Sequence, residues 1–184
     1  MEKLQQYQID LKSLSPATTY KYSYLLDNDF FDRIDGPEVR KGSVNVSLSV
    51  IRVSSVFEMA FRLEGVITVT CDRCLEDLEI PVTTDNKLVV TFGETFAETS
   101  DERVIVSEEE GFINIAWFMY EFIALAIPMK HVHKSGDCNA VMASKLREHW
   151  VDDQIGEEEN SALRDGNRAV DPRWDKLRNL LEDN

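Results

Sequence analysis

The chain has 184 residues, 43% of them hydrophobic, and a formal net charge of -14. This length and apolar content suffice for one domain with its own core, which excludes global disorder. The negative charge repels nucleic acid and anionic membranes at long range and attracts basic proteins, so neither DNA nor a membrane is an expected partner.

The N-terminal part of the chain predicts two strands and one short helix. Residues 4–12 and 18–26 form the two strands, separated by a Ser-Leu-Ser-Pro turn signal. Residues 27–34 begin with an aspartate that suits a helix N-cap, and a Gly-Pro pair follows them. No secretory signal pattern precedes these elements, so we expect the protein to stay in the cytoplasm.

The strongest strand signal is the alternation of apolar and polar side chains through 44–50 and again through 57–63. This pattern is typical of an antiparallel sheet that buries one face. We interpret Gly65 as a bulge or bend in the second of these strands. A further strand pair is expected at 79–83 and 87–92.

The acidic segment 93–111 predicts an exposed loop with one short strand at 104–106. Residues 115–126 predict a buried apolar helix that ends before Pro128. That helix falls short of the roughly 20 apolar residues that cross a bilayer. Residues 139–150 predict one more helix.

We expect an α+β fold with a curved antiparallel sheet, one buried helix and a C-terminal helix after a linker. Residues 1–150 form its single domain, 151–170 an acidic flexible linker, and 171–184 an amphipathic helix. Asp171 suits the N-cap of that last helix, and Trp174 lies on its apolar face. This face either docks on its own domain or contacts a partner.

The pair Cys71 and Cys74 falls on a predicted turn between two strands. Two thiolates at this spacing can hold one zinc ion, which needs two more ligands. His133 and Cys138 follow the apolar helix and would complete a Cys3His set. A site with four protein ligands leaves no open position for substrate, so the predicted role of this zinc is structural.

Other interpretations of the cysteines stay open. Cysteine is often buried as a small hydrophobic residue without a ligand role. A redox dithiol begins a helix, whereas strand-like residues flank Cys71 and Cys74 on both sides. Cys138 with His133 could supply a nucleophile and a base, but no oxyanion-stabilising motif accompanies them. A redox or hydrolytic cysteine enzyme is therefore the alternative to a non-catalytic protein, and an unrelated protein-interaction domain is the third possibility.

Residues 130–149 carry four Lys and Arg, three His and two acidic residues, inside a very acidic chain. Together with Arg73 from the cysteine turn, Lys130, His131 and Lys134 form the candidate contact surface for RNA or another partner. A mildly basic loop without a binding role is the alternative.

Three parts of the sequence resemble the YceD family. Residues 71–76, Cys-Asp-Arg-Cys-Leu-Glu, are similar to its Cys-x-Arg-Cys hallmark. Residues 121–128 resemble its second hallmark, an acidic-apolar helix that ends at a proline, and His133 and Cys138 match the His and Cys that follow in the family. Residues 171–174, Asp-Pro-Arg-Trp, are similar to its common C-terminal ending.

This resemblance implies a role in the accumulation of large-subunit ribosomal RNA in bacteria or chloroplasts. We therefore expect a non-catalytic ribosome-biogenesis factor that binds the large-subunit rRNA precursor, a basic ribosomal protein, or both. The acidic net charge favours the basic protein.

Overall fold

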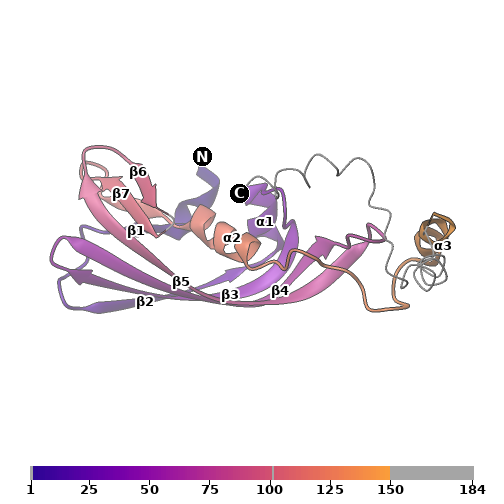
Figure 1. Ribbon diagram of the computed structural model, residues 1–184. Helices are drawn as coiled ribbons and strands as arrows, with labels where there is room; N and C mark the ends of the chain where they lie inside the picture. The colour runs from indigo at the N-terminus through magenta and orange to yellow at the C-terminus, as the bar shows by residue number, and fades with distance from the viewer. Residues whose placement is uncertain (1, 101, 150–184) are drawn as a thin grey trace, which may run out of the picture. The chain divides into compact units, whose positions relative to one another are not determined.

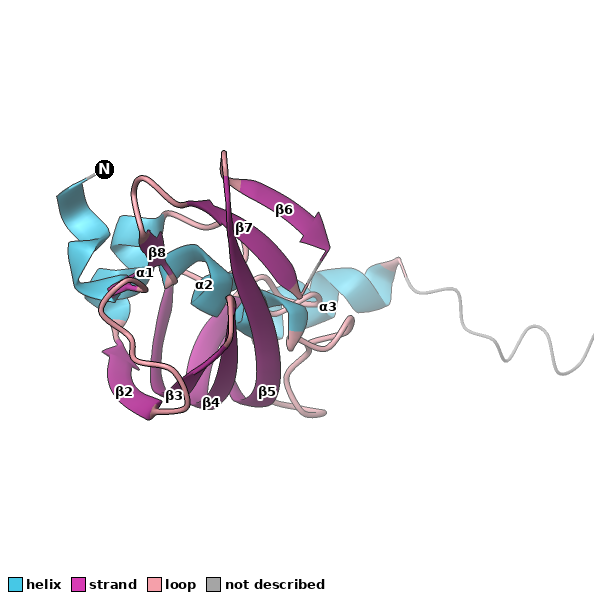
Figure 2. Cartoon of the chain, turned by 90° about the vertical axis from the view of Figure 1, so that its left-hand side faces the viewer, coloured by secondary structure: helices cyan, strands magenta, loops and turns pink. Residues whose placement is uncertain are grey.

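A curved, open sheet of six strands dominates the computed structural model, which describes residues 2–100 and 102–149 (Figure 1). The strand order is β2-β3-β4-β5-β7-β6. The strands are β2 (Thr19–Leu26), β3 (Lys41–Val53), β4 (Val56–Thr70), β5 (Asp77–Gly93), β6 (Ala97–Ser100) and β7 (Arg103–Ser107). Helix α2 (Ala116–Leu125) lies against the concave face of this sheet (Figure 2). The predicted α+β class is confirmed.

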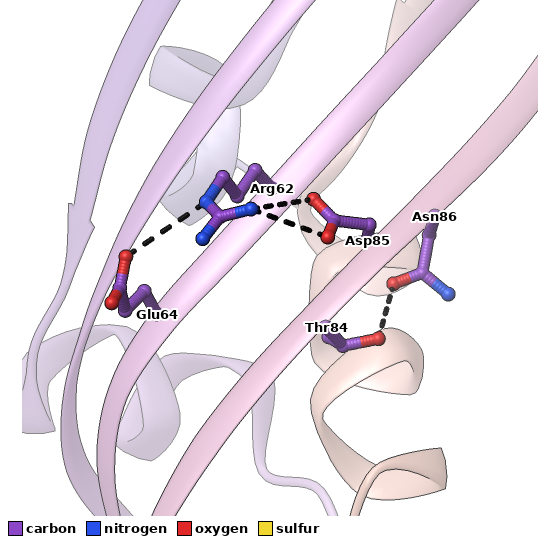
Figure 3. Close-up of polar contacts among 5 residues, drawn as sticks. All are labelled: Arg62, Glu64, Thr84, Asp85 and Asn86. Carbon is purple, nitrogen blue, oxygen red and sulfur yellow. Dashed lines mark hydrogen bonds and ion pairs between the residues drawn. The ribbon is translucent and has the colours of Figure 1, made fainter.

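The alternation predicted for the long strands is confirmed. Val44, Val46 and Leu48 point into the core, and so do Phe61 and Leu63 of the neighbouring strand. The outer face is polar, and its side chains pair across strands (Figure 3). There Arg62 contacts Glu64 at 3.9 Å and Asp85 at 3.3 Å. On the opposite face of the strand that carries Asp85, the Thr84 hydroxyl donates a hydrogen bond to the side-chain oxygen of Asn86 at 2.9 Å.

Two predictions for the sheet are wrong in detail. Gly65 is not a bulge, because it stays in register between Val44 and Val82. A Cβ there would lie 2.2 Å from the Ser43 carbonyl oxygen, so the position requires glycine for a close approach of two backbones. The pair expected at 79–83 and 87–92 is one continuous strand, β5.

The short strand predicted at 104–106 is confirmed as β7, but the segment before it is not only an exposed loop, because β6 is a second strand of the sheet. β7 pairs with β5 in parallel, and β6 pairs with the other side of β7. Val104 and Val106 are buried, so β7 belongs to the core in spite of its acidic flanks.

The N-terminal strand is shorter than predicted. Residues Glu2–Tyr7 form a 3-10 helix, and only β1 (Gln8–Asp10) is a strand, paired with β8 (Phe112–Asn114). The carboxylate of Asp10 accepts hydrogen bonds from the backbone of the next turn, which ends the strand. Helix α1 (Asn28–Ile34) is confirmed, with Asp27 as its N-cap.

The buried helix is confirmed as α2, but one of its faces is open. Phe118, Met119 and Phe122 are buried, whereas Trp117 and Leu125 are 45% and 82% exposed. On the buried side, the Tyr120 hydroxyl accepts hydrogen bonds from two backbone N–H groups of the α1–β3 connection, at 2.9 and 3.3 Å. No helix among the described residues is long and apolar enough to cross a membrane.

The chain divides into two units, Met1–Ala143 and Ser144–Asn184. The helix predicted at 139–150 is α3 (Ala140–Glu148), which contains the boundary between the two units. The linker predicted at 151–170 and the helix predicted at 171–184 lie outside the described residues.

Candidate metal centre

Cys71 and Cys74 lie on the tight turn between β4 and β5. The Cys71 N–H donates to the Glu76 carbonyl at 2.8 Å, and the Leu75 N–H donates to the Cys71 carbonyl at 2.9 Å. Leu75 adopts the left-handed conformation with φ of 63°, which closes the turn. Both cysteines are buried, at 0% and 3% exposure.

The segment that follows α2 pairs with this turn through Asp72 and His131. The Asp72 N–H donates to the His131 carbonyl at 3.0 Å, and the His131 N–H donates to the Asp72 carboxylate at 2.8 Å. The Nε2 atom of the His131 ring lies 3.2 Å from the other carboxylate oxygen. These contacts hold residues 131–138 beside the cysteine turn, although about sixty residues separate the two segments in the sequence.

The four residues predicted as ligands come together. The sulfur atoms of Cys71, Cys74 and Cys138 and a ring nitrogen of His133 all lie within 4.8 Å of one another. A tetrahedral ion with metal–sulfur bonds of about 2.3 Å would place its ligand atoms about 3.8 Å apart. The observed cluster is therefore close enough to hold a metal ion.

The orientation of the His133 ring fits a ligand. Its Nδ1 lies 3.3 Å from the Cys74 sulfur, while its Nε2 lies 3.2 Å from the Asp77 carbonyl oxygen. With the proton on Nε2, the ring donates to that carbonyl and keeps the Nδ1 lone pair for an ion. Most metal-binding histidines donate their other ring N–H to a carbonyl or carboxylate in this way, which fixes the orientation of the ring.

The surroundings of the cysteine turn favour the thiolate form of Cys71 and Cys74. Burial raises the pKa of Cys71, but hydrogen bonds from three surrounding backbone N–H groups outweigh it and lower that pKa from 9.0 to about 6. Backbone hydrogen bonds, that from Glu76 foremost, lower the pKa of Cys74. The hydrogen bond to Cys71 raises the pKa of His133, and burial raises the pKa of Cys138. Thiolates are the form that binds metal.

The residues predicted to contact RNA or a partner lie at the same end of the sheet, except Trp174, which lies outside the described residues. Lys130 and Lys134 are exposed, and Arg73 is half-buried. His131 is occupied by its pair with Asp72. Carboxylates interrupt this basic surface, and they are Asp72, Glu76, Asp77 and Asp137.

The sequence predicted the four residues of this cluster but not the residues that position them. The pairing of Asp72 with His131 leaves no mark in the sequence, because it joins two distant segments. Asn139 accepts hydrogen bonds from the N–H groups of Val141 and Met142, as an N-cap does, and donates to Glu76 on the cysteine turn. Its place before a predicted helix was a signal that could have been used.

One comparison with known proteins gives a match. A family model described as "Large ribosomal RNA subunit accumulation protein YceD" matches residues 59–181. The match includes both halves of the metal centre, together with helix α2 between them. Neither a curated protein nor a solved structure matches the chain.

Proposed function

Because the chain belongs to the YceD family, we propose that it is a non-catalytic accessory factor of ribosome biogenesis that supports accumulation of large-subunit rRNA in the cytoplasm. The observation that carries this proposal is the family match over 59–181. It covers two thirds of the chain and includes the four clustered ligands, so it extends well beyond a single short motif.

The metal centre supports a structural role for this end of the protein. Three thiols and one imidazole are the donor set that zinc prefers, so Cys71, Cys74, His133 and Cys138 would hold a zinc ion. When bound, the ion would supply a cross-link between the β4–β5 turn and the segment after α2. Four protein ligands complete a tetrahedron, which leaves no position for a substrate and argues against metal-assisted hydrolysis.

The cysteine-enzyme alternative has weaker support. Cys71 and Cys74 are buried, and Cys74 faces the imidazole of His133 at 3.3 Å within the cluster. A nucleophilic thiol has to reach substrate, and a metal-bound thiolate is shielded from it. Thiol titration before and after chelation separates the two. Thiols that react only after chelation support the structural centre, and one thiol that reacts fast in both states supports the enzyme.

The charge of the molecule favours a basic ribosomal protein over bare rRNA as the direct partner. The net charge is -14, and the basic residues at the metal end are interleaved with carboxylates. Binding to RNA phosphates requires a surface where cations outnumber anions, whereas an acidic protein can shield a basic one before assembly.

Deletion of the gene, followed by measurement of large-subunit and small-subunit rRNA and a ribosome gradient, tests the role itself. We expect the large-subunit rRNA to fall relative to the small-subunit rRNA, and wild-type protein to restore it. An unchanged ratio would contradict the proposal.

Affinity purification with and without RNase tests the partner. We expect basic ribosomal proteins of the large subunit to remain bound after RNase treatment. If every partner is lost with the RNA, the protein-shielding form of the proposal is wrong while the rRNA role stands.

A further inference from the structure

A groove runs along helix α2 between that helix and the β6–β7 edge of the sheet. One part has a volume of about 500 Å³ and the other about 280 Å³. Glu98 and Phe118 line both parts, so the two are continuous, and we call them together the α2 groove. The metal centre contributes no residue to it.

Large apolar side chains in and beside this groove are left open. Phe96 is 56% exposed, Phe112 is 38% exposed and Trp117 is 45% exposed. Leu125 at the far end of α2 is 82% exposed. Singly such residues are ordinary, but several gathered along one groove mark a binding surface.

The open face of α2 has a regular pattern. Trp117, Glu121 and Leu125 are spaced by four residues, so they form one stripe along the helix. Within it, the Trp117 indole N–H donates to the Glu121 carboxylate at 2.6 Å, which fixes the ring at the groove. The stripe therefore presents an apolar, an acidic and an apolar group in sequence.

The charge of the groove has one sign. Its lining includes Glu98, Glu110 and Glu121, and none of the described residues that line it is Lys, Arg or His. Three carboxylates around an apolar floor repel RNA phosphates and also repel a second copy of this acidic chain. They complement a cationic ligand that carries apolar side chains.

The edge strand beside the groove adds a backbone contact. β6 stands last in the strand order, and no described strand pairs with its outer edge. An extended segment can add to such an edge through main-chain hydrogen bonds while its side chains enter the groove.

We propose that the α2 groove is the docking site for a Lys- and Arg-rich segment of a protein partner, anchored by apolar side chains between α2 and β6. The inference deepens the proposed function and rests on it for the class of partner. It assigns protein binding to this groove and leaves the metal centre to hold the structure.

Binding of a defined peptide to the full chain tests the site. The probe is a fluorescent peptide of about ten residues, rich in Lys and Arg and carrying two leucines. About five of them in extended form span the roughly 15 Å length of α2, and the rest flank the groove. We expect binding that weakens about tenfold when Glu98, Glu110 and Glu121 are all changed to Gln, because three favourable charge contacts are lost. Glutamine at Glu121 can still accept the indole hydrogen bond.

A matched variant separates the groove from the general negative charge. Changing Glu58, Glu64 and Glu79 to Gln removes equal charge from the outer face of the sheet, where all three are exposed. We expect this variant to bind within about twofold of wild type, since these charges lie away from the groove. Trp117→Ala should weaken binding about tenfold, as for an aromatic anchor of an interface.

Two further probes test the chemistry. The same peptide with serine in place of leucine should bind more weakly, because it lacks the apolar anchor. A single-stranded RNA of similar length should show no binding that depends on the groove residues. In a Trp150→Phe, Trp174→Phe variant, the remaining Trp117 should change its fluorescence on addition of the leucine peptide, which gives a readout that needs no groove mutation.

Several results would overturn the inference. Equal weakening by the two triple variants would mean that only net charge attracts the peptide. Equal binding of the serine peptide would show that apolar side chains do not anchor the peptide in the groove. RNA binding that depends on the groove glutamates, or a dimer that Trp117→Ala dissociates, would give the groove a different occupant. If the groove variants restore rRNA levels in the deletion strain while peptide binding is lost, the groove does not serve the proposed function; an unchanged rRNA ratio on deletion itself leaves peptide binding standing and removes the function.

Discussion

The cysteine turn and the α2 groove differ in how far their side chains are buried and hydrogen-bonded within the chain. At the turn, Cys71 and Cys74 are buried and the His133 ring has a partner for each nitrogen. In the groove, Phe96 and Leu125 remain 56% and 82% exposed. Side chains that are buried and hydrogen-bonded within the chain stabilise the fold, whereas exposed apolar side chains are available to a partner. Substitutions should therefore separate the two, with loss of stability at the turn and loss of affinity at the groove.

The largest effect is expected when one of the four candidate metal ligands is removed, and this variant is the strongest test of the comparison. Cys74→Ser is expected to abolish stoichiometric zinc and lower the Tm by about 10 °C or more, because binding to a structural zinc site contributes directly to folding. Elemental analysis and calorimetry measure both, and chelation should lower the Tm of wild type but not of the variant. A variant with normal Tm and no metal would remove the structural role.

The pH dependence of the metal-free protein should sharpen the same contrast. The lowered pKa of Cys71 contributes stability that is complete above its usual value of 9.0 and is lost as the pH falls through about 6. The raised pKa of His133 contributes stability below its usual value of 6.5, which is lost as the pH rises through the raised value. Denaturant unfolding of chelated protein should give greatest stability between these limits.

The control for this profile is His133→Asn, which should lose the alkaline fall and keep the acid one. A chelated wild type with stability independent of pH from 5 to 9, a range of about four units around these pKa values, would contradict the thiolate–imidazolium interaction.

A smaller effect is expected at Leu75, where the turn requires a left-handed backbone. Its φ is 63° and its side chain is 66% exposed, so glycine relieves the conformation and removes little packing. Leu75→Gly should stabilise the protein by about 1 kcal/mol. The measurement is denaturant unfolding of metal-loaded protein, with Leu75→Ala, which keeps the Cβ, as the control that should not stabilise it.

The smallest effect on stability is expected at Trp117, which is the groove residue whose change should cost most binding. Trp117→Ala should alter the free energy of unfolding by less than about 1 kcal/mol, because the ring is half exposed. Calorimetry beside the peptide assay checks this. A large loss of stability would show that the ring belongs to the core, and the distinction between the two regions would disappear at this position.

Much of the fold followed from local pattern. The alternation of apolar and polar residues predicted β3 and β4, and Asp27, which suits an N-cap, predicted the start of α1. β5 was divided in two because Asp85 and Asn86 are typical of turns, yet the outer face gives Asp85 an ionic partner in Arg62. β7 was predicted as a short strand at 104–106 inside an exposed loop. Its burial and its parallel pairing with β5 have no local signal, because acidic residues flank its two buried valines.

The candidate metal centre was predictable for the same reason that zinc sites often are. A Cys-x2-Cys turn and a nearby His and Cys carry their chemistry in the residue types themselves. The sequence thus determined the four candidate ligands, the sheet alternation and the acidic charge. Tertiary structure alone decided that Asp72 would pair with His131, about sixty residues later in the sequence, and that one stripe of α2 would stay uncovered. A helix apolar on nearly all sides does not reveal which face its neighbours will leave open, because that depends on packing between segments distant in the chain.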